Sequence, residues 1–179
     1  LVIYCDKEVE SFVWARRDPR NTVVIIKNLE SFKTNFDFYE QVQTIRNNLS
    51  WKTQASWLSD SPQSALEYYN PVVMSKFFML HDVCIMNPLD SENFYWIDAG
   101  LSSTVHPGYF YKDKVHEKLP KIVKSLLFVC FPYDGQVEVH GFEKKKFNEY
   151  CGTNSEYVSR GGFFGGKAEY IKRFNGLYY

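Results

Sequence analysis

The pattern of apolar and polar residues predicts that strands and helices alternate from the start of the chain. Apolar runs at 1–5 and 22–27 predict two buried strands, and the apolar spacing within 7–17 predicts a helix between them. Strand, helix and strand in such a short stretch form a βαβ unit, which implies a parallel sheet.

The pattern continues with helices and strands through the rest of the sequence. Helical spacing recurs in 37–49 and in a largely apolar stretch at 71–87, after which the aromatic strand 94–97 stops at Asp98. The second half predicts these elements: helix 115–126, strands 127–131 and 136–140, a basic helix 142–150, strand 157–164 and helix 167–174. No repeat or linker divides the chain, so we expect one α/β domain with a mixed, mostly parallel central sheet flanked by helices.

Composition and charge restrict the classes of partner. Aromatic residues make 18% of the 179 residues, which is too much apolar surface for a disordered chain. The 21 basic and 21 acidic residues balance, so no global positive field attracts nucleic acid or an anionic membrane. The longest apolar runs also fall short of the roughly 20 residues that a membrane span needs. An anionic ligand would therefore need a local site.

The ends of the sequence and its cysteines add two expectations. The chain opens at Leu1 without a methionine and closes on Tyr179 without a polar tail, so we expect a fragment of a longer protein. Its four cysteines are widely spaced, a pattern that signals neither a zinc site nor a disulfide framework.

Asp98 is the first candidate for chemistry, because it follows a buried strand directly. A carboxylate there is costly unless it is paired or bound to a metal, and ligand crevices in open α/β sheets lie at the carboxyl ends of strands. The alternative is an aspartate that caps the turn through Ala99 and Gly100. A second acid at position 100 would complete an Asp-x-Asp metal motif, but Gly100 stands there.

A glycine-rich string is the second candidate. Gly161, Gly162, Gly165 and Gly166 surround two phenylalanines, and such a run is unfavourable in a strand unless another backbone or a ligand approaches closely. The string nearly fits the phosphate-binding loop that ends in Gly-Lys-Ser/Thr, with Lys167 in place, but Ala168 lacks the hydroxyl that binds Mg²⁺.

Together these residues resemble a known family. The segment 94–100, the preceding Ser75-Lys76 pair and the string 158–166 are similar to the HtrL/YibB family, which resembles glycosyltransferases of the GT-A type. The glycine string is also similar to one in the blood-group A/B type glycosyltransferases. The resemblance implies a GT-A-like, Rossmann-like domain with a nucleotide-binding half at 1–100 and an acceptor-side half at 101–179.

The resemblance also implies roles for individual residues. Lys76, Asp98, Ala99 and Gly100 would bind a nucleotide-sugar donor, in particular a UDP-sugar, with Asp98 as the first acid of a Mn²⁺ or Mg²⁺ motif. The wall near the donor sugar and the glycan acceptor would comprise Arg160, Gly161, Gly162, Phe163, Phe164, Gly165 and Gly166. The catalytic carboxylate would follow Tyr179. The location would be cytoplasmic or peripheral to a membrane in a bacterial or viral protein, and luminal in a eukaryotic one.

Physical chemistry is consistent with these roles, and two alternatives stay open. Transfer from a nucleoside diphosphate leaves charge on the phosphates, which a metal or local cations such as Lys76, Arg160 and Lys167 must neutralise. Tyr95, Trp96 and the two phenylalanines could stack on a sugar or on uracil. The alternatives are a non-catalytic carbohydrate-binding or scaffold domain of the same fold and a nucleotide hydrolase with a phosphate-binding loop.

Overall fold

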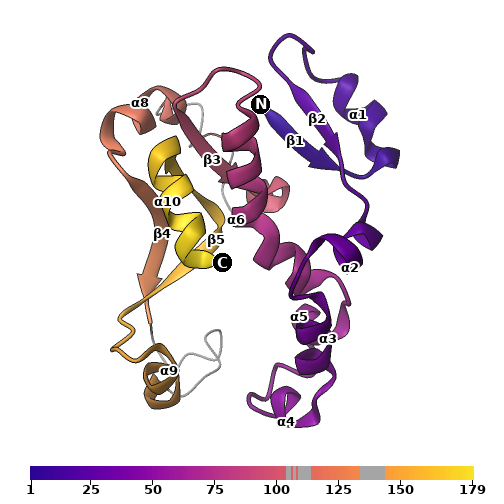
Figure 1. Cartoon of the computed structure of the whole chain (residues 1–179), viewed down its shortest axis with the longest axis vertical. Helices are drawn as coiled ribbons and strands as arrows, with labels where there is room; N and C mark the ends of the chain where they lie inside the picture. Colours follow the sequence, from indigo (N-terminus) through magenta and orange to yellow (C-terminus); the bar gives the residue numbers. More distant parts are fainter. Residues whose placement is uncertain (104–105, 107, 109–113, 134–143) are drawn as a thin grey trace. The chain divides into compact units, whose positions relative to one another are not determined.

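The chain forms two compact units (Figure 1). The computed structural model describes residues 1–103, 106, 108, 114–133 and 144–179. Unit 1 comprises Leu1–Ser75 and Pro132–Tyr157, and unit 2 comprises Lys76–Phe131 and Val158–Tyr179. The predicted strand at 136–140 lies outside the described residues.

Unit 1 begins with the predicted βαβ unit. Strands β1 (Val2–Cys5) and β2 (Val23–Ile26) pair in parallel, with Val2 opposite Val23. Between them lie the 3₁₀ helix η1 (Lys7–Val9), which Asp6 caps through its side chain, and helix α1 (Glu10–Trp14). The prediction of a parallel pair at the start of the chain is confirmed.

Most other elements of unit 1, in the residues that the structure describes, are helices. Asn28 and Ser61 cap η2 and α5 through their side chains, as is common at helix starts because the first N–H groups lack partners. The elements are η2 (Leu29–Ser31), α2 (Phe32–Asn35), α3 (Tyr39–Asn47), α4 (Leu49–Lys52), α5 (Pro62–Ala65) and α9 (Lys144–Cys151). Helix α9 confirms the predicted helix at 142–150 over 144–150 and extends it by one residue to Cys151; residues 142 and 143 lie outside the described residues.

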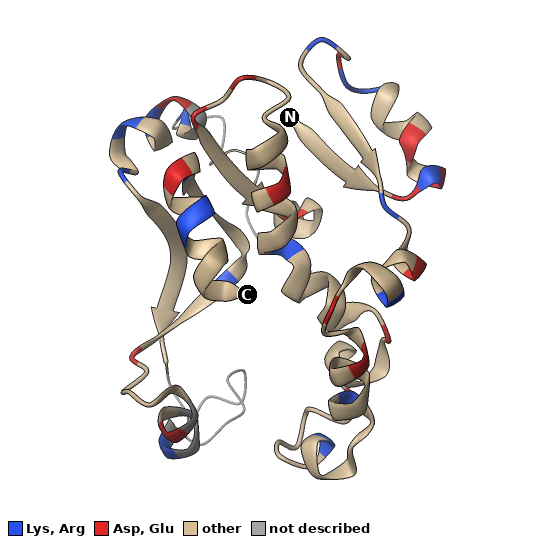
Figure 2. Ribbon diagram, viewed as in Figure 1, with Lys and Arg blue, Asp and Glu red and all other residues tan. Residues whose placement is uncertain are grey.

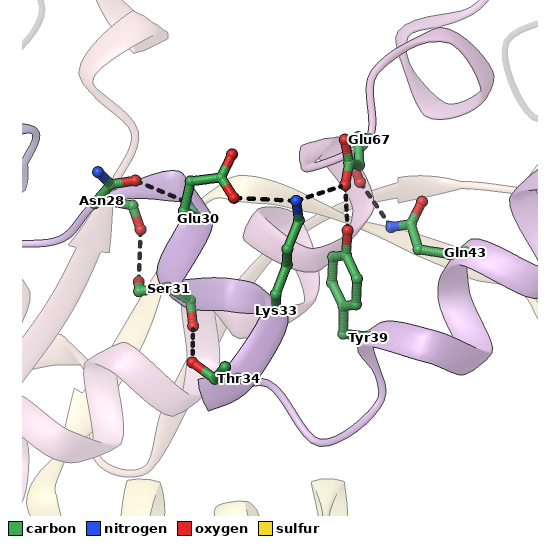
Figure 3. Close-up of polar contacts among 8 residues, drawn as sticks. All are labelled: Asn28, Glu30, Ser31, Lys33, Thr34, Tyr39, Gln43 and Glu67. Carbon is green, nitrogen blue, oxygen red and sulfur yellow. Dashed lines mark hydrogen bonds and ion pairs between the residues drawn. The ribbon is translucent and has the colours of Figure 1, made fainter.

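A polar network ties these helices together (Figure 3). The Lys33 ammonium lies 3.0 Å from Glu30 and 3.5 Å from Glu67, and Gln43 donates to the Glu67 carbonyl at 2.9 Å. The buried phenol of Tyr39 donates to the Glu67 carboxylate. Loss of water by burial, together with this acceptor, raises the pKa of Tyr39 to about 12.

The raised pKa of Tyr39 predicts a loss of stability at alkaline pH. A group whose pKa is higher in the folded state stabilises the fold below its unfolded pKa of about 10, and this contribution disappears as pH rises towards about 12. We expect the free energy of unfolding of the unmodified chain to fall more steeply between these pH values than that of Tyr39→Phe. Urea unfolding across this range tests the difference, and equal slopes would contradict it.

The described residues of unit 2 form a three-stranded sheet and two long helices. Helix α6 (Tyr69–Met86) enters from unit 1, and α10 (Ala168–Tyr178) closes the chain. The other elements are β3 (Asn93–Ile97), η3 (Ala99–Ser103), α8 (Val115–Ile122), β4 (Leu126–Pro132) and β5 (Tyr157–Lys167). The strand order is β3-β5-β4, and β3 runs antiparallel to β5 with Trp96 opposite Phe164.

Aromatic rings form the core of unit 2. Phe164 on β5 is 5% exposed and stacks against Phe77 of α6, Trp96 of β3 and Phe128 of β4, with ring centroids 5.8, 6.4 and 6.0 Å away. Phe174 of α10 contacts Phe77 at 4.7 Å, so α6 and α10 pack on the same face of the sheet. Much of the aromatic content of the chain is therefore structural.

Two of the glycines in β5 allow its neighbours to approach. Gly165 and Gly166 have φ angles of +148° and +153°, and a Cβ added to them would lie 2.1 Å from the Phe94 carbonyl oxygen and 2.0 Å from that of Ser125. Glycine is needed at these two positions of the strand, because the backbones on both sides come closer than any side chain would permit.

The predicted α/β class is confirmed. The described residues do not form the predicted single, mostly parallel central sheet. They contain a small parallel sheet and a separate sheet with an antiparallel pair. The prediction of a mostly parallel sheet came from the βαβ unit at the start of the chain. The antiparallel pairing of 93–97 with 163–167 joins segments far apart in the sequence, and the local residue pattern does not indicate it. In the described residues no helix is long and apolar enough to span a membrane.

Candidate functional site

The backbone at Asp98 joins a strand end to a turn. Its N–H donates to the Gly162 carbonyl at 2.9 Å, which extends the β3–β5 ladder by one residue. Its carbonyl accepts from the Leu101 N–H at 3.0 Å, which starts η3. The strand therefore ends here in a fixed geometry, and the side chain is held at the carboxyl end of β3.

The Asp98 carboxylate is bound on both oxygens. The Lys76 ammonium of α6 lies 2.6 Å from Oδ2, and the indole N–H of Trp96 donates to Oδ1 at 2.6 Å. Trp96 and Asp98 lie two residues apart on an extended segment, so their side chains share one face of the sheet. Asp98 is therefore a paired carboxylate, while its carbonyl rather than its side chain accepts the first hydrogen bond of the turn.

Lys76 is the more buried partner. Its side chain is 13% exposed, against 33% for Asp98, and the ammonium also approaches the Gly161 carbonyl at 3.4 Å. An ammonium with so little access to water needs a nearby anion, because its charge would otherwise lose its hydration uncompensated. Lys76 and Asp98 are 22 residues apart in the sequence, and their ion pair links α6 to the end of β3.

Gly161 and Gly162 lie beside the ion pair and leave room there. A Cβ at Gly162 would lie 3.8 Å from Asp98 Oδ2 and 3.5 Å from Leu101 Cδ1, and one at Gly161 would lie 4.0 Å from Lys76 Nζ. Both positions therefore tolerate a Cβ at ordinary contact distances, in contrast to Gly165 and Gly166. The backbone does not require these two glycines, but a group that approaches the ion pair would benefit from them.

Arg160 is on the same face of β5 as Gly162, because side chains alternate along a strand. Its guanidinium carbon lies 5.4 Å from the centroid of the Phe131 ring on β4, on the side of β5 away from β3. The guanidinium of Arg160 is therefore directed towards β4 and is not part of the ion pair.

The remaining predicted residues divide between core and surface. Phe164, Gly165 and Gly166 are buried: the phenylalanine stacks on neighbouring rings, and the two glycines lie against backbone atoms of neighbouring segments. Phe163 is half-buried and stacks on Tyr95 at 5.9 Å, and burial raises the pKa of the Tyr95 phenol. Ala99 and Gly100 are exposed at the start of η3.

The phosphate-binding-loop interpretation does not agree with the strand assignment. Residues 161–167 continue β5 without a break, and α10 begins directly at Ala168. Such a loop must curl its backbone N–H groups around a phosphate, whereas here the glycines pair with β3. Lys167 ends the strand and is distant in register from the ion pair, since it lies opposite Asn93.

The residues around Asp98 do not fit a divalent metal. In the described part of the chain no group of three or more His, Cys, Asp or Glu side chains could hold an ion. Both oxygens of Asp98 already have N–H donors, and Gly100 replaces the second acid. Mn²⁺ and Mg²⁺ prefer several oxygen ligands, which this arrangement does not offer.

Trp96 is the site residue whose function the sequence did not indicate. The sequence predicts that its ring is a stacking surface; in the structure its indole N–H donates to Asp98, a role that the sequence did not suggest. The two-residue spacing was the available signal, because a donor two residues before a strand-end carboxylate lies on the same face.

Charge is otherwise spread thinly over both units. Figure 2 shows acidic and basic residues interspersed along the helices, while β1, β2, β3 and β4 carry neither sign. This agrees with the equal numbers of basic and acidic residues. An anionic ligand would therefore depend on individual side chains such as Lys76 and not on a charged surface.

Comparison with known proteins gives one match. A family model described as "Bacterial protein of unknown function (HtrL_YibB)" matches residues 1–179. Neither the curated proteins nor the solved structures give a match.

Proposed function

The chain belongs to the HtrL_YibB family, whose function is unknown, and from the site at Asp98 we propose that it is a glycosyltransferase that uses a nucleotide-sugar donor. The donor is a UDP-sugar and the acceptor is a hydroxyl of a glycan, within a GT-A-like arrangement. The observation that carries the proposal is the Lys76–Asp98 ion pair beside Gly161 and Gly162.

The geometry supports donor binding in three ways. Lys76 is an ammonium held rigidly by a carboxylate, so its hydrogen bonds have fixed directions when a phosphate arrives. Gly162 leaves space next to Asp98, and Arg160, two residues earlier on β5, is a further cation of the same strand although its guanidinium lies over the Phe131 ring. Preorganised donors of this kind stabilise the negative charge that develops on a departing diphosphate, because they need no reorientation during the reaction.

The site would act on the leaving group rather than on the acceptor. Cleavage of the bond between the sugar and the diphosphate transfers an electron pair to the phosphate oxygen. Lys76 and Arg160 would stabilise that oxygen electrostatically, while Asp98 and Trp96 keep the lysine in place.

A second candidate function is a non-catalytic carbohydrate-binding domain. Its support is that the Lys76–Asp98–Trp96 group is already complete as a structural link between α6 and β3. It predicts binding of glycans without any requirement for a nucleotide, and measured transfer of sugar from a UDP-sugar would exclude it.

The space at Gly162 provides the test of donor binding. Calorimetry with UDP, UDP-glucose and UDP-N-acetylglucosamine should show binding to the unmodified chain, and Gly162→Val should weaken it by about ten- to two-hundredfold because the side chain fills the approach to Asp98. Valine is favourable in a strand, so the variant should fold.

Gly176→Ala in α10 is the control, because nothing lies within 4 Å of its Cβ position and the residue belongs to no proposed site. It should bind as the unmodified chain does. If the unmodified chain binds none of the UDP-sugars, the proposal is wrong; if Gly162→Val binds them normally, the donor site lies elsewhere.

A further inference from the structure

The Asp98 carboxylate has a resident cation, the ammonium of Lys76. We propose that Lys76 takes the place of a divalent metal at this site, so that the chain binds nucleoside diphosphates without a metal. The donor-binding part rests on the proposed function, whereas the exclusion of metal from Asp98 rests on the ion pair alone.

Geometry makes replacement of Lys76 by a metal unfavourable. An ion bound at Oδ2 would have to displace an ammonium that lies 2.6 Å away and is only 13% exposed. The displaced ammonium would then face a dication at short range without a counter-charge. The Gly161 carbonyl, 3.4 Å from Nζ, holds the lysine from a second side.

Ligand number points the same way. A hard divalent cation bound to protein usually has about six oxygen ligands, of which one or two are carboxylates. Asp98 offers one carboxylate whose two oxygens accept from Lys76 and Trp96, and the residue two positions on is Gly100. The position that would hold the second acid lies at the start of η3 and carries no side chain.

The ammonium can perform the task that the metal would have. It has three N–H donors. Among the described residues, one is directed at Asp98 and a second at the Gly161 carbonyl, so the third can donate to a phosphate oxygen. Because Asp98 neutralises Lys76, the pair supplies directed hydrogen bonds rather than net charge. A net positive charge would have to come from another cation such as Arg160, whose guanidinium would leave the Phe131 ring to reach a phosphate.

Metal binding is measured directly, without a nucleotide. Titration with Mn²⁺, followed by the electron paramagnetic resonance signal of the free ion, should give the same result for the unmodified chain and for Asp98→Asn. Lys76→Met keeps the length of the side chain and removes its charge, and it should bind Mn²⁺ about tenfold more tightly because Asp98 is released. This gain should vanish when Asp98→Asn is added.

Nucleotide binding is measured in the same variants. The affinity for UDP should be unchanged when EDTA is added to the unmodified chain, and it should fall about ten- to hundredfold in Lys76→Met, since a charge-assisted hydrogen bond is lost. Lys121→Met, which removes an exposed lysine of unit 2, is the control and should bind UDP normally. If Lys76→Met does not fold, Lys76→Arg keeps the charge and should bind UDP without a metal.

Two results would overturn the inference. One is Mn²⁺ binding to the unmodified chain that disappears in Asp98→Asn, and the other is UDP binding that EDTA abolishes. If UDP does not bind with or without Mn²⁺, the proposed function fails, and the Mn²⁺ titration still decides between a lysine and a metal at Asp98.

Discussion

Gly166→Ala is expected to destabilise the chain by about 4 kcal/mol or more, a loss that few single substitutions cause. The added Cβ would lie 2.0 Å from the Ser125 carbonyl oxygen and 3.1 Å from the Leu126 Cα, which are backbone atoms that no rotamer change can move away. The φ angle of +153° adds strain for any residue with a side chain. Relief would require β4 and β5 to separate.

The same argument applies to Gly165 on the opposite side of the strand. Its Cβ would lie 2.1 Å from the Phe94 carbonyl oxygen, so Gly165→Ala should force β3 away from β5. Since domains are stable by only about 5–15 kcal/mol, either variant should show a large fall in its urea midpoint or fail to accumulate as a folded protein.

Gly176→Ala and Gly161→Ala are the controls for these two variants. Gly176 lies in α10 with nothing within 4 Å of its Cβ position, so alanine should stabilise the chain by about 0.5–1 kcal/mol through helix propensity. Gly161→Ala should change stability little, because its nearest neighbour is the flexible end of Lys76 at 4.0 Å. An unchanged urea midpoint for Gly166→Ala would show that β4 and β5 are not packed as described.

The contrast among these glycines shows how far the sequence alone could predict the fold. Their unusual density in a strand-like segment indicated close approach by a backbone or a ligand, and for Gly165 and Gly166 the backbone alternative is confirmed. Local pattern could not indicate which strands approach, because antiparallel pairing of β5 with β3 brings together segments about seventy residues apart. The parallel pair β1 and β2 was predictable, since its connection is short and its pattern local.

The candidate site was predictable residue by residue but not as an arrangement. A carboxylate after an apolar strand pointed to Asp98, and the family resemblance pointed to Lys76. That the two form an ion pair depends on how α6 packs on the sheet, through rings such as Phe77 against Phe164. Residue types alone do not determine that packing. For the same reason the sequence did not show that Phe164 is a core residue, and it suggested a ring that could stack on a sugar.

Asp98→Asn is expected to weaken both the fold and donor binding. Asparagine keeps the shape and can still accept one hydrogen bond, but the Lys76 ammonium, 13% exposed, loses its counter-charge. Breaking a fully buried ion pair costs about 3–5 kcal/mol, and the 33% exposure of Asp98 reduces this to about 1–3 kcal/mol because water screens part of the loss. Thermal unfolding measures the stability change, and Asp82→Asn, an exposed acid on α6, is the control.

A double-mutant cycle separates the ion pair from the two residues taken singly. If Lys76 and Asp98 stabilise the chain through each other, Lys76→Met combined with Asp98→Asn should lose less than the sum of the two single losses, with a coupling energy of about 1–2 kcal/mol. Additive losses would mean that the ion pair does not form in solution. Without its counter-charge, Lys76 no longer presents its N–H groups in a fixed direction, so Asp98→Asn should also weaken UDP binding by about tenfold or more. If the ion pair is only a structural link, Asp98→Asn should lower the stability and leave the UDP affinity of the folded chain unchanged.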